Sequence, residues 1–106
     1  MWETLPTFYF LFLWKLLSIK FDMKINSEKI EFLKSFGKRI QLLREEKQLS
    51  LRQLAQNCEI DYSDISKIEK GLRNIQMATI VELAKGLDVA PKILFDFDFN
   101  IQTERN

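Results

Sequence analysis

The sequence predicts a compact all-α domain of four to five helices, and three observations support this fold class. From residue 27 to residue 95, apolar residues recur every three or four positions, which is the period of helices that share one core. Residues typical of helix starts and stops divide this pattern into short segments. The chain has 106 residues, 46% of them hydrophobic and 29% charged, which suits a single globular domain. A short C-terminal strand is the one departure from helix that we expect.

The first two helices are defined by an apolar stripe and by a start signal. The first is expected to run from Ser27 to Lys47, where one face carries four apolar residues: Leu33, Phe36, Ile40 and Leu43. The second is expected to start at Ser50, because Ser50 and Gln53 match a capping box. Its inward face carries Leu51, Leu54, Ala55 and Cys58. Cys58 is therefore expected to be a core residue and not a reactive thiol.

The third and fourth helices have similar signals. Asp61 is a suitable N-cap for a short helix over residues 62–70, and Gly71 supplies the left-handed residue that ends it. Three residues of this segment are expected to face the core: Ile65, Ile68 and Leu72. The fourth helix is expected over 77–86, with a last turn at 91–95. Its expected core residues are Ile80, Leu83, Ala84 and Leu87.

Polar side chains occupy the outer face of the third helix. They lie at i, i+1, i+4, i+5 and i+8: Tyr62, Ser63, Ser66, Lys67 and Lys70. These side chains form hydrogen bonds readily, and the stripe becomes basic toward its end. Two short helices joined by a tight turn, with a longer helix before them, are typical of a helix-turn-helix.

The segment from Phe36 to Phe95 carries three specific sequence features. They are the Leu54-Ala55 pair, the run Ile65-Ser66-Lys67-Ile68-Glu69-Lys70-Gly71, and the spacing of Leu83, Ala84 and Leu87. On these residues the chain resembles the Cro and phage-repressor type of helix-turn-helix domain, the XRE-like family of bacterial regulators. The resemblance implies a compact, repressor-like DNA-binding domain over residues 27–95.

The resemblance also implies how this domain contacts double-stranded DNA. The third helix of such domains lies in the major groove, so the expected base-reading residues are Tyr62, Ser63, Ser66 and Lys67. Lysine suits guanine, serine is an adaptable donor and acceptor, and tyrosine contacts a thymine methyl or a phosphate. The expected phosphate contacts are Ser50, Leu51, Arg52, Lys70, Arg73 and Asn74. The alternative for Tyr62 is packing on a neighbouring loop.

The resemblance assigns structural roles and also shows two departures. Related domains pair an arginine of the first helix with a glutamate of the third, and Arg44 and Glu69 occupy those positions. The family commonly has glutamine where this chain has Leu51, so a phosphate contact there falls to backbone N–H groups. Ile75 replaces a frequent proline, which predicts a less rigid loop. Asp64 is expected to support the helix start and to repel phosphate, adding discrimination more than affinity.

Composition argues against an enzyme. The chain has no histidine, one cysteine and three scattered glycines, which excludes the common zinc sites, histidine-activated nucleophiles and glycine-rich phosphate loops. We therefore expect no catalytic residues, no metal, no cofactor and no small-molecule substrate. A single cysteine also favours a reducing, cytoplasmic setting.

The N-terminal extension, residues 1–26, differs from the rest of the chain, because seven aromatic residues fall within its first 22 positions. The apolar run from Phe8 to Ile19 is shorter than the ~20 residues of a spanning helix and contains Lys15. The features of a secretory signal are missing. Our leading interpretation is that residues 1–22 are translated upstream sequence before a start at Met23. The alternatives are a helix packed on the domain and a membrane anchor.

The C-terminal tail, residues 96–106, begins with a different period. From Phe95 to Ile101, apolar and polar residues alternate, which is typical of a half-buried strand. The rest of the chain after Met23 is helical, so the expected partner is the same strand of a second subunit, with Phe97 and Phe99 buried between the copies. Residues 8–12 as the partner strand and a frayed tail are the alternatives.

These observations predict a cytoplasmic, sequence-specific DNA-binding transcriptional regulator that acts as a homodimer. The net charge is only +1, so two copies are needed to make enough phosphate contacts. Restriction-modification controllers, small phage repressors and antitoxins share this size, and the sequence does not choose among them. The competing classes are a protein-interaction module with the same fold and a membrane-tethered regulator.

Overall fold

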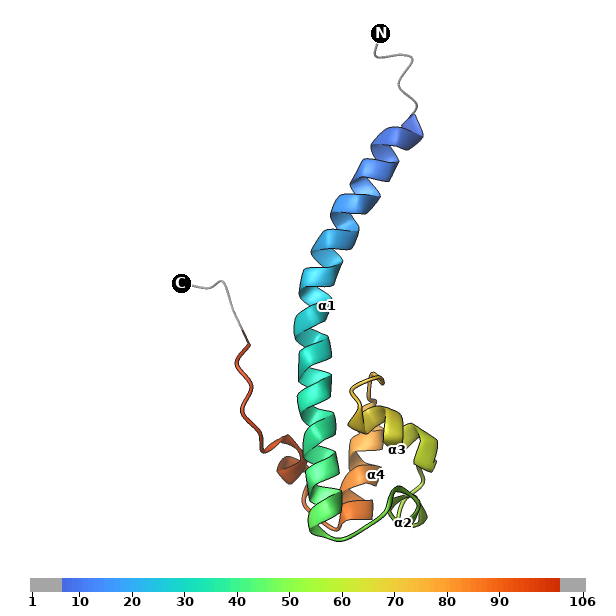
Figure 1. Cartoon of the computed structure of the whole chain (residues 1–106), viewed down its shortest axis with the longest axis vertical. Coiled ribbons are helices and arrows are strands. Elements are labelled where there is room, and N and C mark those ends of the chain that lie inside the picture. The colour runs from blue at the N-terminus through green and yellow to red at the C-terminus, as the bar shows by residue number, and fades with distance from the viewer. Residues whose placement is uncertain (1–6, 102–106) are drawn as a thin grey trace.

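The computed structural model describes residues 7–101, with side chains at Leu13 and from Ser27 onward. Within these residues the chain forms four α-helices and one 3-10 helix, and no strand (Figure 1). In chain order they are α1 (Thr7–Glu46), α2 (Leu51–Gln56), α3 (Tyr62–Glu69), α4 (Met77–Leu87) and the 3-10 helix η2 (Pro91–Phe95). The all-α prediction is confirmed, and α3, α4 and η2 match their predicted bounds to within one residue.

The largest departure from prediction is the length of α1. It spans 40 residues and begins at Thr7, not at Ser27. Ser27 is a good helix-start residue, but no glycine or proline lies between Thr7 and Phe36, so nothing in the sequence interrupts the helix. The N-terminal half of α1 projects away from the other helices (Figure 1), and the molecule is 69 Å long. Among residues 7–101, no helix is both long enough and apolar enough to cross a membrane.

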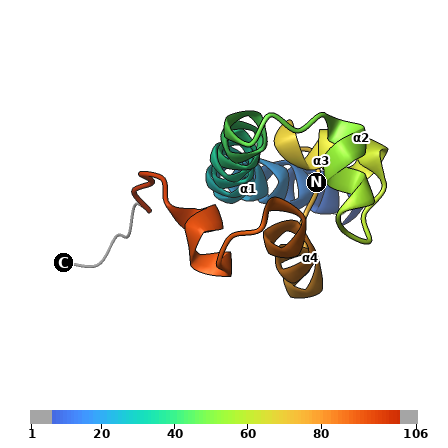
Figure 2. The same cartoon turned by 90° about the horizontal axis from the view of Figure 1, so that it is seen from below.

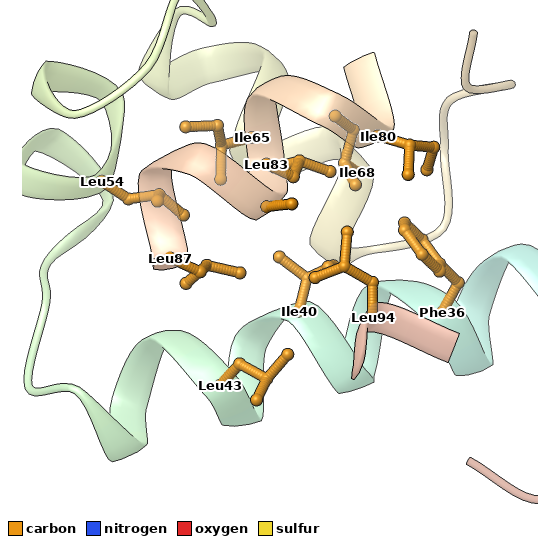
Figure 3. Close-up of a cluster of buried hydrophobic side chains, with 11 residues drawn as sticks. Phe36, Ile40, Leu43, Leu54, Ile65, Ile68, Ile80, Leu83, Leu87 and Leu94 are labelled. Atoms are coloured by element: carbon orange, nitrogen blue, oxygen red, sulfur yellow. The ribbon is translucent and has the colours of Figure 1, made fainter. Parts of the chain in front are cut away.

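One hydrophobic core lies between α1, α3 and α4, and α2 and η2 each add one leucine (Figure 3). Its buried members are Phe36, Ile40, Leu43, Leu54, Ile65, Ile68, Ile80, Leu83, Ala84, Leu87 and Leu94. Helical spacing predicts all of them except Leu94. Fully burying one large apolar side chain stabilises the fold by roughly 1.5–3 kcal/mol, so this cluster is what holds α3 in place.

The core prediction for Leu72 is wrong. Leu72 lies at the surface with 67% of its area exposed. α3 ends at Glu69, and Gly71 adopts a left-handed conformation with φ 75°, as expected of a residue that stops a helix. The chain changes direction at Gly71, so the helical spacing that relates Ile68 to Leu72 no longer applies.

The end of α3 lies directly on α1 because Gly37 has no side chain. A Cβ atom at Gly37 would collide with the backbone carbonyls of Ile68 and Glu69. The two helices therefore approach more closely than any larger residue would permit. This contact sets the position of α3 relative to the rest of the domain.

Cys58 is half-buried and packs against the core, where the sequence places it. Its Sγ lies 3.3 Å from the Leu54 carbonyl oxygen, to which the thiol donates. Burial raises the pKa of the Cys58 thiol, which keeps it protonated. These surroundings suit a packing residue and not a nucleophile.

Residues 96–101, which we call the C-terminal arm, are irregular and do not form the predicted strand. The arm lies on the side of α1 opposite to α2 and α3 (Figures 1 and 2). The Phe32 ring on α1 is 5.5 Å from the Phe97 ring and 5.1 Å from the Phe99 ring, between centroids. The alternating phenylalanines thus pack on α1 of their own chain, because Phe32 and Phe36, one turn apart, present an aromatic face. Residues 102–106 of the tail lie outside the described residues.

Candidate nucleic-acid interface

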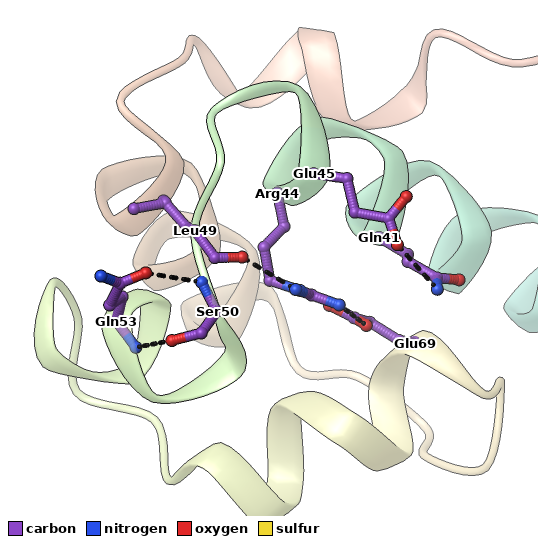
Figure 4. Close-up of polar contacts among 7 residues, drawn as sticks. All are labelled: Gln41, Arg44, Glu45, Leu49, Ser50, Gln53 and Glu69. Atoms are coloured by element: carbon purple, nitrogen blue, oxygen red, sulfur yellow. Dashed lines mark hydrogen bonds and ion pairs between the residues drawn. The ribbon is translucent and has the colours of Figure 1, made fainter.

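α2 and α3 form a helix-turn-helix on the side of the domain away from the C-terminal arm (Figure 2). The predicted start of α2 is confirmed, because Ser50 Oγ accepts a hydrogen bond from the Gln53 N–H at 3.1 Å, and Gln53 Oε1 accepts one from the Ser50 N–H at 2.8 Å (Figure 4). Leu54 of α2 and Ile65 of α3 are both fully buried. Their packing turns the opposite face of α3 outward.

The outer face of α3 carries the polar stripe. Tyr62 is 47% exposed, Ser63, Lys67 and Lys70 are exposed, and Ser66 is more recessed. The structure therefore brings the four expected base-reading residues onto one accessible helix face. Exposed donors and acceptors on a rigid helix are what contact with base edges requires.

One expected phosphate ligand lies beside an expected base reader. The Arg52 guanidinium of α2 stacks over the Tyr62 ring, with its Cζ atom 4.8 Å from the ring centre. Such cation–π contacts hold both groups in a defined orientation. Tyr62 is therefore supported by α2, and Arg52 keeps its charge on the same surface as the α3 stripe.

Two expected phosphate ligands at the start of α2 have other partners. The Ser50 hydroxyl is engaged in the capping box, and the Leu51 side chain packs against the core. Leu51 thus has only its backbone N–H to offer an anion, as its apolar side chain implies.

The remaining expected phosphate ligands lie on and after the end of α3. Lys70 and Asn74 are exposed, and their side chains have no hydrogen-bond or ionic partner within residues 7–101. Arg73 differs, because its Nη2 atom lies 2.7 Å from Asp64 Oδ1 in the first turn of α3. The two side chains are 48% and 43% exposed, respectively. Asp64 therefore binds a cation that is itself expected to bind phosphate.

The Arg44–Glu69 pair joins α1 to the C-terminal end of α3 (Figure 4). Arg44 Nε and Nη2 donate to the two Glu69 carboxylate oxygens at 2.7 and 3.0 Å, and Nη1 donates to the Leu49 carbonyl at 2.8 Å. The side chains are only 13% and 8% exposed. The hydrogen bond to Glu69 raises the pKa of Arg44, against the opposing effect of burial. This bidentate pair fixes the angle at which α3 is presented.

The sequence predicts the residues of this surface, but it does not predict two of the contacts among them. The Arg52–Tyr62 contact crosses the turn between α2 and α3, and the Asp64–Arg73 contact passes around the end of α3. Neither spacing is a helical i,i+3 or i,i+4 interval, so the rules for pairs within one helix do not reveal them. Opposite charge at Asp64 and Arg73 is the single sequence signal for the second pairing.

An all-α bundle that exposes one polar helix of a helix-turn-helix defines a class of nucleic-acid-binding domain. Residues 40–94, just over half of the chain, match the helix-turn-helix family HTH_3, and the chain belongs to this family. The predicted resemblance to XRE-like regulators is thereby confirmed.

Particular relatives are restriction-modification control proteins. The chain is 38% identical over 63 residues to control protein C.BamHI of Bacillus amyloliquefaciens, an alignment that covers 58% of this chain and 78% of that protein. It is 40% identical to the crystal structure of the controller protein C.AhdI from Aeromonas hydrophila, with a TM-score of 0.58, covering 59% of this chain and 96% of that one. The controller C.Esp1396I, solved as a tetramer with its natural 35-base-pair operator, is 29% identical with a TM-score of 0.58, covering 61% of this chain and 86% of that one.

Proposed function

We propose that this chain is a sequence-specific DNA-binding transcriptional regulator that inserts α3 into the major groove. The observation that carries this proposal is the fixed presentation of the α3 stripe. The Arg44–Glu69 pair and the Gly37 contact hold α3 on α1, while Tyr62, Ser63 and Lys67 face outward. An α-helix with such side chains fits the major groove.

Base and phosphate contacts have different locations in this proposal. Lys67 and Ser63 read base edges, with Tyr62 and Ser66 beside them on α3. Five cationic, amide or backbone groups around the stripe position the helix on the phosphates: Leu51 N–H, Arg52, Lys70, Arg73 and Asn74. Phosphate contacts give affinity without sequence preference, and base contacts give the preference. Ser50 contributes through its cap, which fixes the start of α2.

The regulator acts as a homodimer in this proposal, through an apolar surface that we call the dimer patch. It consists of the exposed residues Met77, Val81, Phe95 and Ile101. Met77 and Val81 lie one turn apart on α4, and Met77, Phe95 and Ile101 line a common groove. Phe97 and Phe99 of the C-terminal arm pack on α1, so the partner copy meets α4, η2 and the exposed Ile101 at the end of the arm. Two copies of a chain with a net charge of +1 would double the phosphate contacts.

The dimer patch can be tested with one substitution. We expect Val81→Asp to shift the protein from dimer to monomer in sedimentation equilibrium and to weaken DNA binding, because a carboxylate would be buried between the copies. Leu42→Asp is the control, since Leu42 is 46% exposed on α1, similar to Val81 at 51%, but lies outside the patch. A Val81→Asp protein that remains dimeric would place the interface elsewhere.

Control of a restriction-modification system is the process we propose, on the strength of the control proteins that this chain resembles over most of their length. Binding to DNA implies a cytoplasmic location, and no enzymatic activity is proposed. Selection of bound duplexes from genomic DNA with purified protein tests both the DNA-binding function and the regulated process. We expect enrichment of a two-fold symmetric sequence near genes for a restriction endonuclease or methyltransferase. Enrichment elsewhere would refute this process, and no enrichment would refute the regulator itself.

A further inference from the structure

The first turn of α3 contains a carboxylate whose charge suits the helix N-terminus but has the wrong sign for binding DNA. Asp64 lies on α3 between the stripe residues Ser63 and Ser66, and its side chain is 43% exposed. A free carboxylate at this place would repel the phosphates of a bound duplex. In this chain, however, the carboxylate is paired with Arg73 at 2.7 Å.

The pairing leaves most of the Arg73 guanidinium available. Only Nη2 contacts Asp64, and within residues 7–101 neither Nε nor Nη1 has a hydrogen-bond partner. Arg73 follows the left-handed Gly71 in the loop between α3 and α4, where no regular element holds a long side chain. A guanidinium with one edge on a carboxylate has its other donors directed elsewhere, in the fixed geometry of its planar group.

We propose that Asp64 is a positioning residue that holds Arg73 in the orientation needed to bind a DNA phosphate. The carboxylate anchors one nitrogen of the guanidinium, and the other donors bind the phosphate. The same contact neutralises Asp64, so the first turn of α3 approaches the DNA without a free negative charge. Asp64 therefore increases affinity although its charge has the wrong sign for DNA. This inference rests on the proposed function of α3.

The sign of the effect gives a sharp test in a double-mutant cycle. The probe is the duplex that the wild-type chain selects most strongly from a random-sequence pool, and dissociation constants are measured by fluorescence anisotropy. We expect Asp64→Ala to weaken binding by about 2- to 5-fold, since the orientation of Arg73 is lost. Arg73→Ala should weaken binding by roughly tenfold per subunit at 0.1 M salt, as loss of one phosphate contact in each copy predicts. In the Arg73→Ala background, Asp64→Ala should instead strengthen binding by about twofold, because an unpaired carboxylate is removed.

Two control substitutions distinguish the positioning of Arg73 by Asp64 from the effect of charge alone on DNA binding. Asp61 lies just before α3, is exposed, and makes no side-chain cap hydrogen bond. Asp61→Asn should therefore strengthen binding in either background. Lys70 is an exposed cation three residues before Arg73 in the sequence, and it has no carboxylate partner within residues 7–101. The effects of Lys70→Ala and Asp64→Ala on log Kd should be additive, whereas those of Arg73→Ala and Asp64→Ala should not.

The outcomes distinguish this assignment from the proposed function. If Asp64→Ala strengthened binding in the wild-type background, Asp64 would be a competitor of the phosphate and the assignment would be wrong. Additive losses at Asp64 and Arg73 would also overturn it. If the wild-type chain selected no duplex, the proposed function would fail together with the assignment. Melting temperatures should stay within about 5 °C of wild type because the pair is exposed, so binding is compared among folded proteins.

Discussion

Two ion pairs lie at opposite ends of α3, and they differ mainly in their exposure to water. At the C-terminal end, Arg44 and Glu69 are 13% and 8% exposed and share two hydrogen bonds. At the N-terminal end, Arg73 and Asp64 are 48% and 43% exposed and share one. Removing one partner of a buried pair leaves the other charge without water or a counter-ion. Removing one partner of an exposed pair leaves a charge that water can solvate. The first pair therefore determines where α3 lies, and the second remains available to a ligand.

The difference also explains how a chain with almost no net charge can present a DNA-binding surface. The Arg44 guanidinium donates its hydrogen bonds to Glu69 and to the Leu49 carbonyl, so Arg44 stabilises the fold and does not bind phosphate. Arg52, Lys67, Lys70 and Arg73 keep accessible charge around α3. Local placement of cations around one helix thus substitutes for a strongly basic composition.

The largest effect is expected from breaking the buried pair. Glu69→Ala should lower the free energy of unfolding by about 3 kcal/mol, because the Arg44 guanidinium would stay buried without its carboxylate. Urea denaturation followed by circular dichroism measures this loss. Asp64→Ala is the matched control at the other end of α3 and should cost less than about 1 kcal/mol. Equal losses of unfolding free energy in the two variants would contradict the distinction between a buried and an exposed pair.

An intermediate effect, on binding and not on stability, is expected at the exposed face of α3. Lys67→Ala should weaken binding to the selected duplex by about 1–3 kcal/mol and relax the preference at one base position. Its unfolding curve should match that of the wild type because Lys67 is exposed. Arg73→Ala should weaken binding to all duplexes alike and reduce the salt slope by about 1 for each subunit bound. An unchanged site preference in Lys67→Ala would mean that α3 does not read the sequence.

Much of the fold was predictable, because the core depends on helical periodicity and local caps. Phe36, Ile40 and Leu43 are buried at the predicted spacing, and Ser50 and Gln53 form the predicted capping box. The predictions that were wrong concern features that helical periodicity and cap residues do not determine. α1 extends from Ser27 back to Thr7 because no residue between them interrupts the helix. A suitable cap residue alone does not end a helix.

The candidate site was predictable as a set of residues but not as a set of contacts. The motif places Tyr62, Ser63 and Lys67 on the outer face of α3, where the structure has them. The pairing of Asp64 with Arg73 depends on the path of the chain after Gly71, and the packing of Phe97 depends on the aromatic rings that α1 presents. Such contacts between distant segments follow from tertiary geometry, which periodicity and charge do not encode.

The smallest effect is expected from removing the first 22 residues, because the N-terminal half of α1 projects away from the other helices (Figure 1). A chain that begins at Met23 should unfold cooperatively, with a melting temperature within a few degrees of the full chain, and should bind the selected duplex with unchanged affinity. Every buried core residue in the described part of the chain lies after Met23, the first being Phe36. Ser27 is a suitable cap for the shortened helix. Calorimetry and anisotropy on the two lengths check this expectation. A broad, non-cooperative melt of the shorter chain would show that residues 1–22 belong to the core.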